Sequence, residues 1–329
     1  MNPFRVGVIG VGHLGALHVR MLKDLPGAHI AGIFDASPER LAKMAAEHGV
    51  PAFPGVSELL REVDAVTIAT PTSTHFAVGK EALESGKHIF VEKPITQSVG
   101  EAEMLCRLAR ERGLILQVGH IERFNPAILA LEPYEIRPLF IESHRLSQFN
   151  PRGTDVPVVL DLMIHDIDLI LSFVRAPVKS IEASGVAVVS DTADIANARI
   201  QFANGCVANV TASRISQRKM RKMRLFQQNC YISIDFSDGT AEVFRLAGEG
   251  GEVTHGLVVG EIGSGSRKRA VVYEQPEVKE VNALKHEIGL FLDSARNGTP
   301  PIVSGEDGKR ALEVAHTIME KISQQVFPT

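Results

Sequence analysis

Cysteine is scarce in this sequence. Of 329 residues only Cys106, Cys206 and Cys230 are cysteines, and they lie far apart along the chain. Three widely spaced cysteines offer neither a disulfide framework nor the close pairs that form a zinc site. A reducing compartment is the simplest interpretation. We therefore expect a cytoplasmic protein with no bound metal.

Long uninterrupted hydrophobic runs are also lacking. The most apolar long stretch, residues 156–174, contains the ionisable side chains of Asp161, His165, Asp166 and Asp168. A membrane-spanning helix needs about 20 predominantly apolar residues and rarely tolerates so many ionisable groups. The first residues enter an apolar segment without the pattern of a secretory signal, so we expect neither a membrane anchor nor a removable leader.

A strong net charge of either sign is absent as well. The net charge is −4, with 22% charged and 44% hydrophobic residues. This is the composition of an ordinary globular protein. Such a chain has no general attraction to nucleic acid or anionic membranes, and we expect neither as a partner. The length suits two domains better than a single core.

Short apolar segments alternate with amphipathic ones in the first third of the chain. The apolar segments are 4–9, 30–34, 65–70, 88–91 and 115–118, and amphipathic stretches between them include 38–48, 73–85 and 99–112. Near-continuous apolar strands separated by helices predict a doubly wound parallel sheet that is covered on both faces. We assign this domain to residues 1–120.

The pattern changes after residue 120. A helical segment, 159–174, precedes β-rich segments at 181–189, 196–202, 206–213, 231–236 and 242–246, with glycine turns at 203–205 and 237–239. Successive strands joined by such turns predict a mostly antiparallel sheet. Helical patterns at 282–295 and 305–323 close the chain, and we expect the Gly/Ser-rich segment 260–266 to be an exposed loop. The fold class is therefore α/β, with an α+β domain over residues 121–329.

A glycine-rich loop follows the first apolar segment directly and opens a helical pattern. It consists of Gly10, Val11, Gly12, His13, Leu14 and Gly15. Glycines at this spacing permit a tight turn, close approach of a pyrophosphate and close packing of helix against strand. The helix start then offers free N–H groups to phosphates. The alternative is a glycine-rich turn without a ligand.

An acidic residue ends the second apolar segment. Asp35 follows Gly15 at about the 20-residue spacing of a carboxylate that binds the adenosine ribose. Its charge would repel a 2′-phosphate, so the sequence favours NAD over NADP. Arg40 lies nearby and could serve a phosphate, although we interpret it as a solvated helix residue.

Two further groups of residues carry chemistry. Glu92, Lys93 and Pro94 follow the fourth apolar segment, and Asp161 and His165 are four residues apart, so that they share one face of a helix. Each has an ordinary explanation when taken singly, because lysines are usually solvated and a histidine on an apolar helix usually belongs to the core.

Taken together and in this order, the motifs resemble the glucose–fructose oxidoreductase and inositol dehydrogenase family (Gfo/Idh/MocA). The resemblance covers essentially the whole chain, from the glycine loop through Ala69-Thr70-Pro71 and His75, Glu92-Lys93-Pro94 and the Asp161/His165 helix. It implies a Rossmann domain and a C-terminal domain with a large open sheet that often serves oligomerisation, so we expect a homodimer or homotetramer. Met163 is a departure, because many members have glycine there.

The resemblance also implies roles in an NAD-dependent dehydrogenase. Lys93 and His165 would flank the reacting sugar hydroxyl, with Asp161 nearby. Histidine titrates near neutrality and can accept the hydroxyl proton as hydride leaves carbon, while the lysine stabilises alkoxide character. The resemblance predicts a cis Lys93–Pro94 peptide. Thr70, Pro71, His75, Glu92 and Lys93 would border the cofactor, although His75 could equally cap the following helix.

The segment Gly119 to Pro126, with His120, Arg123 and Asn125 as substrate-binding candidates, resembles the branch that acts on nucleotide sugars. It implies a UDP-hexose substrate, foremost UDP-N-acetylglucosamine, oxidised at C3 to a 3-keto sugar. Oxidation of free inositol or a monosaccharide is one alternative. A non-catalytic NAD-binding sensor is another, which the presence of both Lys93 and His165 disfavours.

A basic stretch could supply partners for the diphosphate. Its cations are Arg214, Arg218, Lys219, Arg221, Lys222 and Arg224, of which Arg214 is a substrate-binding candidate. Cations of this kind pair readily with phosphate oxygens. The alternative is a strand edge or subunit surface that is protected by charge.

Overall fold

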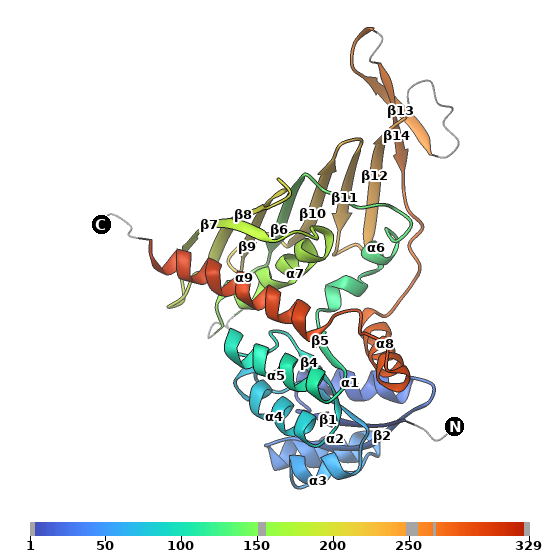
Figure 1. Ribbon diagram of the computed structural model, residues 1–329, viewed down its shortest axis with the longest axis vertical. Coiled ribbons are helices and arrows are strands. Elements are labelled where there is room, and N and C mark those ends of the chain that lie inside the picture. The colour runs from blue at the N-terminus through green and yellow to red at the C-terminus, as the bar shows by residue number, and fades with distance from the viewer. Residues whose placement is uncertain (1–3, 151–155, 248–255, 266–267, 326–329) are drawn as a thin grey trace. The chain divides into compact units, whose positions relative to one another are not determined.

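The computed structural model describes residues 4–150, 156–247, 256–265 and 268–325 (Figure 1). The chain forms two compact units. The first unit comprises residues 1–124 and 282–313, and the second comprises residues 125–281 and 314–329. A late segment of the chain therefore returns to the first unit, so a single boundary in the sequence cannot separate the two units.

The first unit is built on a parallel sheet with the strand order β2-β1-β3-β4-β5. The strands are β1 (Phe4–Ile9), β2 (Ala28–Phe34), β3 (Ala65–Ile68), β4 (His88–Glu92) and β5 (Leu116–Gly119). The chain passes from β1 to β2 on one side and then to β3 on the other side of β1. Open α/β sheets bind ligands at such a reversal, outside the carboxyl ends of the strands.

Helices cover both faces of this sheet. They are α1 (His13–Lys23), α2 (Pro38–His48), α3 (Val56–Arg61), α4 (Thr72–Glu84), α5 (Val99–Glu111) and α8 (Ala283–Asn297), with a short 3₁₀ helix η1 (Ile121–Phe124). One core contains side chains of α1, α2 and α8, among them Val19, Met44 and Phe291. Helices α3, α4 and α5 pack beside one another. The predicted doubly wound parallel sheet is confirmed.

The second unit contains a sheet with the order β13-β14-β12-β11-β10-β6-β9-β8-β7. The strands are β6 (Phe140–Leu146), β7 (Val178–Val186), β8 (Ile195–Phe202), β9 (Val207–Ser213), β10 (Met220–Gln227), β11 (Cys230–Asp235), β12 (Thr240–Leu246), β13 (Leu257–Ile262) and β14 (Arg269–Glu274). Strands β6 and β9 run parallel, and the other neighbouring strands of this sheet are antiparallel. The predicted large, mostly antiparallel sheet is confirmed.

Some elements differ from the sequence expectations. The expected loop at 260–266 is wrong in its first part, because residues 260–262 belong to β13. Residues 263–265 are exposed and lie outside any strand, and residue 266 lies outside the described residues. Every residue of β13 is exposed, so the strand lacks the alternation of buried and exposed residues that identifies a strand in a sequence. Figure 1 shows β13 and β14 extending beyond the other strands of this sheet.

The second unit also contains α6 (Pro126–Leu129), α7 (Ile164–Phe173) and part of α9 (Gly305–Ser323), whose first residues belong to the first unit. The expected helix at 159–174 is not uniform, because its first turn is a π-helix, η2 (Val159–Met163). Single π-turns within helices occur frequently at functional sites. No helix among the described residues is long and apolar enough to cross a membrane.

Candidate active site

A groove of about 720 Å³ opens at the carboxyl ends of β1, β2 and β3, where the winding of the sheet reverses. Three loops contribute the residues expected at the cofactor. They supply Gly10, Gly12, His13 and Leu14 after β1, Asp35 and Arg40 after β2, and Thr70 and Pro71 after β3. The topology therefore brings together segments that are far apart in the sequence.

Each of the three glycines in the first loop is required for a different structural reason. Gly10 has φ of +84°, and a Cβ there would lie 2.7 Å from Thr70 Cγ2. A Cβ on Gly15 would lie 1.8 Å from the carbonyl oxygen of Gly10, so only glycine permits this helix to approach the strand. A Cβ on Gly12 would have only the Arg40 guanidinium within 4 Å, at 3.8 Å. Gly12 therefore leaves open space beside the groove.

Helix α1 starts at this open position. Gly12 is its N-cap residue, and no side chain caps the helix. The first N–H groups of an α-helix have no partner within the helix, and together with the helix dipole they attract anions. The start of α1 is thus suited to a pyrophosphate.

Asp35 fastens the glycine loop to the end of β2. Its carboxylate accepts the N–H of Val11 at 2.8 Å and that of Ser37 at 2.9 Å, and only 7% of the residue is exposed. Arg40 Nη1 lies 3.4 Å from both carboxylate oxygens. Arg40 is exposed, as expected of a solvated helix residue, but its guanidinium is paired with Asp35 and partly offsets that charge.

These features together fit a nicotinamide dinucleotide. The open glycine position and the uncapped helix start suit a pyrophosphate, and the carboxylate beside them suits ribose hydroxyls. A bound NAD supplies the hydride acceptor of a dehydrogenase.

His75 is not among the lining residues of this groove. The ring is buried on α4, with Nε2 2.9 Å from the carbonyl oxygen of Thr70 and Nδ1 3.0 Å from that of Pro94. Burial lowers the pKa of His75 from its ordinary value, against the opposing effects of these carbonyls and of the Glu92 carboxylate. No side chain caps α4, so His75 connects two loops instead.

The Lys93–Pro94 peptide is cis, which confirms the prediction. Glu92 precedes it at the end of β4, and its Oε1 lies 2.9 Å from Nε2 of His18 on α1. A Cβ on Gly119 would lie 2.9 Å from the other carboxylate oxygen, so Gly119 leaves room for Glu92. His18 could not be recognised from the sequence as part of this arrangement, because the only signal for it was its place one turn after Gly15.

The other chemical residues belong to the second unit. Asp161 lies in the π-turn η2 and His165 at the start of α7, and both are half-buried. Because the π-turn pairs residues five apart, it changes the angle between the two side chains from that of a regular α-helix.

An ion pair that the sequence analysis missed anchors this helix to the sheet. The Arg145 guanidinium on β6 donates to both oxygens of Asp166, at 2.8 and 3.1 Å, and both side chains are buried. A planar two-bond contact of this kind fixes orientation as well as distance. Asp166 follows His165 in the chain, so the pair also fixes the backbone that carries His165.

The segment after β5 is held by structural contacts. Arg123 Nη2 lies 3.8 Å from Asp307, and His120 is buried. Asn125 Oδ1 accepts the N–H of Ala127 at the start of α6, and its amide nitrogen donates to the Phe236 carbonyl at 3.2 Å. The assignment of these residues to substrate binding stays a prediction.

The basic stretch does not act as one group. Arg214 is only 5% exposed, lies 3.7 Å from Asp194 and donates to the Val156 carbonyl. Asp194 is buried, but N–H groups of residues 188–190 and the Ser190 hydroxyl overcome the effect of burial and lower its pKa to about 2. Lys222 and Arg224 are instead exposed on β10, where they pair with Asp235 and Glu142.

The position of β10 excludes one interpretation of this stretch. Strand β10 has neighbours on both sides, β11 and β6, near the middle of the sheet. The alternative of a charged strand edge is therefore excluded for β10, because Lys222 and Arg224 alternate with the buried side chains of Met223 and Leu225 on an interior strand.

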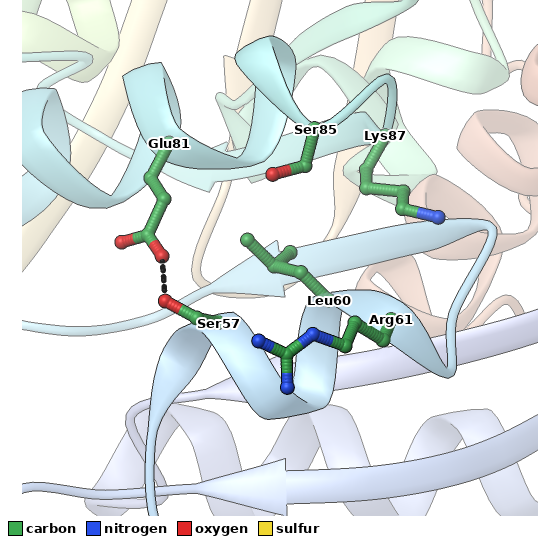
Figure 2. A pocket seen from close by; sticks show the side chains of 6 residues that line it. All are labelled: Ser57, Leu60, Arg61, Glu81, Ser85 and Lys87. Carbon is green, nitrogen blue, oxygen red and sulfur yellow. Dashed lines mark hydrogen bonds between the residues drawn. The ribbon is translucent and has the colours of Figure 1, made fainter.

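A second, smaller hollow of about 350 Å³ lies between α3 and α4 (Figure 2). Three of its polar side chains, Ser57, Glu81 and Lys87, are paired with one another or with backbone. Figure 2 shows Ser57 bonded to Glu81, and Lys87 donates to the Val63 carbonyl at 2.8 Å. Glycine is not among its lining residues, and the groove beside Gly12 is the better candidate for a cofactor.

Known proteins resemble both units. Residues 4–120 match the model of the Gfo/Idh/MocA oxidoreductase family with an NAD-binding Rossmann fold, and residues 141–242 match a C-terminal domain of the same family. UDP-N-acetylglucosamine 3-dehydrogenase of Acidithiobacillus ferrooxidans is 42% identical over 316 residues, which cover 96% of each chain. The scyllo-inositol 2-dehydrogenase (NAD(+)) of Bacillus subtilis is 29% identical over 95% of this chain and 92% of its own.

Solved structures agree with these sequence matches. The structure of UDP-N-acetylglucosamine 3-dehydrogenase GnnA from A. ferrooxidans superposes with a TM-score of 0.87 at 39% identity, over 98% of both chains. The prediction of an NAD-binding oxidoreductase is thereby confirmed. The chain belongs to the Gfo/Idh/MocA family.

Proposed function

We propose that this protein oxidises the C3 hydroxyl of UDP-N-acetylglucosamine with NAD and produces the 3-keto sugar. The substrate assignment rests on the 42% identity, over 96% of both chains, to a UDP-N-acetylglucosamine 3-dehydrogenase. The inositol dehydrogenase of B. subtilis covers nearly as much of the chain but is only 29% identical. The groove beside Gly12 and Asp35 supports the cofactor.

The proton and the hydride leave the substrate by different routes. We assign His165 as the general base that takes the C3 hydroxyl proton, while hydride passes from C3 to the nicotinamide. Lys93 stabilises the oxygen as negative charge develops on it. Asp161 orients these groups or binds a neighbouring hydroxyl. Removal of one proton and one hydride leaves the carbonyl carbon at C3.

The nucleotide part of the substrate serves positioning. Arg123, His120 and Asn125 are the residues that we assign to this side of the substrate, with Arg214 as a further candidate. Contacts far from the reacting carbon help to hold it in reactive geometry. Because Arg214 is buried beside Asp194, its contribution is the weakest part of the assignment.

The test is a comparison of NAD reduction with UDP-N-acetylglucosamine, UDP-glucose, N-acetylglucosamine and myo-inositol. We expect turnover with UDP-N-acetylglucosamine and a product two hydrogens lighter, whose reduction with borodeuteride places deuterium at C3. Turnover of myo-inositol without response to any UDP-sugar would overturn the substrate assignment, while the assignment as a dehydrogenase would stand. NAD binding without turnover of any of them would support the non-catalytic sensor.

We further propose that two copies associate through the sheet of the second unit. A row of five rings crosses neighbouring strands at directly paired positions, namely Phe140, Phe226, Tyr231, Phe244 and Tyr273. Consecutive ring centroids are 5.8, 4.9, 5.6 and 5.1 Å apart. The alternate side chains of these strands are buried, so the row lies on the opposite face, where Phe226 is exposed. A contiguous row of rings, of which Phe226 is exposed and the other four are half-buried, suits a protein interface.

The oligomeric state tests this proposal directly. We expect light scattering to give a dimer or tetramer, and Phe226→Glu to lower the mass toward that of one chain. Phe149→Glu changes an exposed phenylalanine outside the row and serves as the matched control. A monomeric parent protein would refute the interface.

All three cysteines are free thiols, which supports the cytoplasmic location that we propose.

A further inference from the structure

Two buried histidines hold the segment that carries Lys93, one from each side. On the first side, His18 is fully buried on α1, and its Nε2 lies 2.9 Å from Glu92 Oε1. A carboxylate only accepts hydrogen bonds, so Nε2 carries the proton and donates it. Glu92 directly precedes Lys93. The contact therefore connects α1, whose first residues line the cofactor groove, with the segment that carries Lys93.

On the other side, His75 reaches the residue that follows Lys93. Its Nδ1 lies 3.0 Å from the carbonyl oxygen of Pro94, and its Nε2 lies 2.9 Å from that of Thr70. Both oxygens only accept, and a neutral ring donates through one nitrogen. The contact to Pro94 is buried, whereas the contact to Thr70 is partly open to water. Leaving a buried carbonyl without a donor is costly, so the proton belongs on Nδ1.

We propose that His18 and His75 are positioning residues for the reaction, because His18 holds the carboxylate of Glu92 and His75 holds the carbonyl of Pro94, the residues on the two sides of Lys93, and together they restrict where the ammonium group of Lys93 can lie. Neither histidine lines the cofactor groove, although Nε2 of His75 also lies beside the carbonyl of Thr70, which does. The inference rests on the proposed function, in which Lys93 meets the reacting oxygen. A lysine side chain is long and flexible, so a firmly held backbone reduces the range that its ammonium group can reach.

The paired substitutions at each histidine distinguish the two ring nitrogens. The amide nitrogen of glutamine can replace Nε2, and that of asparagine can replace Nδ1. His18→Gln therefore keeps the bond to Glu92, and His18→Asn loses it. At position 75 the order is reversed, because His75→Asn keeps the bond to Pro94 and His75→Gln loses it.

We expect His18→Asn and His75→Gln to lower kcat by roughly 10- to 100-fold, the scale of a small misplacement of a catalytic group. The two variants that keep the bond should retain most of kcat, and the two His18 variants should bind NAD as the parent does. His88→Gln is the control, because His88 lies at the opposite end of β4 and its Nδ1 accepts the N–H of Ile115 at 3.0 Å, a bond that glutamine loses. It should lower Tm without lowering kcat.

A second measurement needs no substrate. Mass spectrometry can measure the rate at which an amine reagent labels Lys93 relative to exposed Lys80. This ratio reports how accessible and reactive the amino group of Lys93 is. We expect His18→Asn and His75→Gln to change this ratio several-fold and the bond-keeping variants to leave it unaltered. Changed labelling in a protein that oxidises no sugar would reject the proposed function but keep the positioning role. Equal effects of asparagine and glutamine at each position, in labelling and in kcat, would overturn the inference.

Discussion

The two units use different means to position functional groups. In the first unit, the groove is formed largely by main chain, and its key residues are glycines that leave space or permit close approach. In the second unit, the helix with His165 and the end of β9 are held by buried ion pairs, Arg145–Asp166 and Arg214–Asp194. The arrangement in the first unit depends on glycines, which have no side chain to fill the space. The arrangement in the second unit depends on buried charged side chains, each of which is paired with an opposite charge.

This difference decides how each unit should respond to mutation. Adding a methyl group to a glycine in the first unit creates overlap or fills the cofactor space. Removing one member of a buried ion pair leaves a charge in a place that water cannot reach. Substitutions in the two units should therefore separate effects on cofactor binding, on chemistry and on stability.

The largest expected effect concerns chemistry in the second unit. His165→Asn should lower kcat by about 100-fold or more, because it removes the proposed general base. NAD binding should be unchanged, since the groove consists of first-unit residues. Lys93→Met, in the first unit, should lower kcat similarly. Stopped-flow reduction of NAD and calorimetric NAD titration measure both quantities. Near-normal turnover in both variants would place the chemistry elsewhere.

Next comes a contrast within the basic stretch. Arg214→Met should destabilise the fold by about 3 kcal/mol, because it leaves the buried Asp194 without its guanidinium. Arg224→Met should cost less than about 1 kcal/mol, because its ion pair with Glu142 is exposed. Urea unfolding gives both values. A raised KM for the UDP-sugar in Arg214→Met, with unchanged stability, would instead support contact with the diphosphate.

The glycine loop offers a contrast between space and packing. Gly15→Ala should destabilise the first unit by about 1–3 kcal/mol, because its methyl group would overlap the Gly10 carbonyl. Gly12→Ala should leave Tm almost unchanged but weaken NAD binding about tenfold, or about 1.4 kcal/mol, because the methyl group occupies open space at the start of α1. Thermal melts with and without NAD distinguish the two. Equal Tm losses would show that Gly12 serves packing alone.

The smallest effect concerns cofactor choice. Asp35→Ala should weaken NAD binding several-fold and reduce the preference over NADP, because it removes both the ribose acceptor and the charge that opposes a 2′-phosphate. Arg40→Ala, which removes only the partner of that carboxylate, should keep the preference for NAD. The ratio of kcat/KM for the two cofactors measures the effect. Equal efficiency with NADP in the parent protein would contradict the role of Asp35.

Much of the first unit could be predicted because its signals are local. Strand β1 and helix α2 have the bounds that were expected from the sequence, and helix α9 does as well. The glycine loop and Asp35 could be recognised because their spacing follows from the geometry of one strand, one helix and the next strand. The short helix α3 was missed, since six residues give too little periodicity.

The partners of charged side chains could not be predicted from the sequence. Arg214 looked like a phosphate ligand because nothing local indicates that Asp194, immediately before β8, lies beside it. His18 and Glu92 are 74 residues apart, so only the fold reveals their contact. Strand β10 was missed because its exposed cations obscured the alternation with Met223 and Leu225.

The return of residues 282–313 to the first unit has a consequence for biosynthesis. Side chains of α8, including Ile288, Phe291 and Leu292, complete the core that contains Val19 and Phe90. A ribosome delivers an N-terminal domain first, and such domains usually fold as they emerge. Here the cofactor-binding sheet has one face incompletely covered until most of the 329 residues have been made. The nascent chain must therefore keep an apolar surface from aggregating throughout synthesis of the second unit.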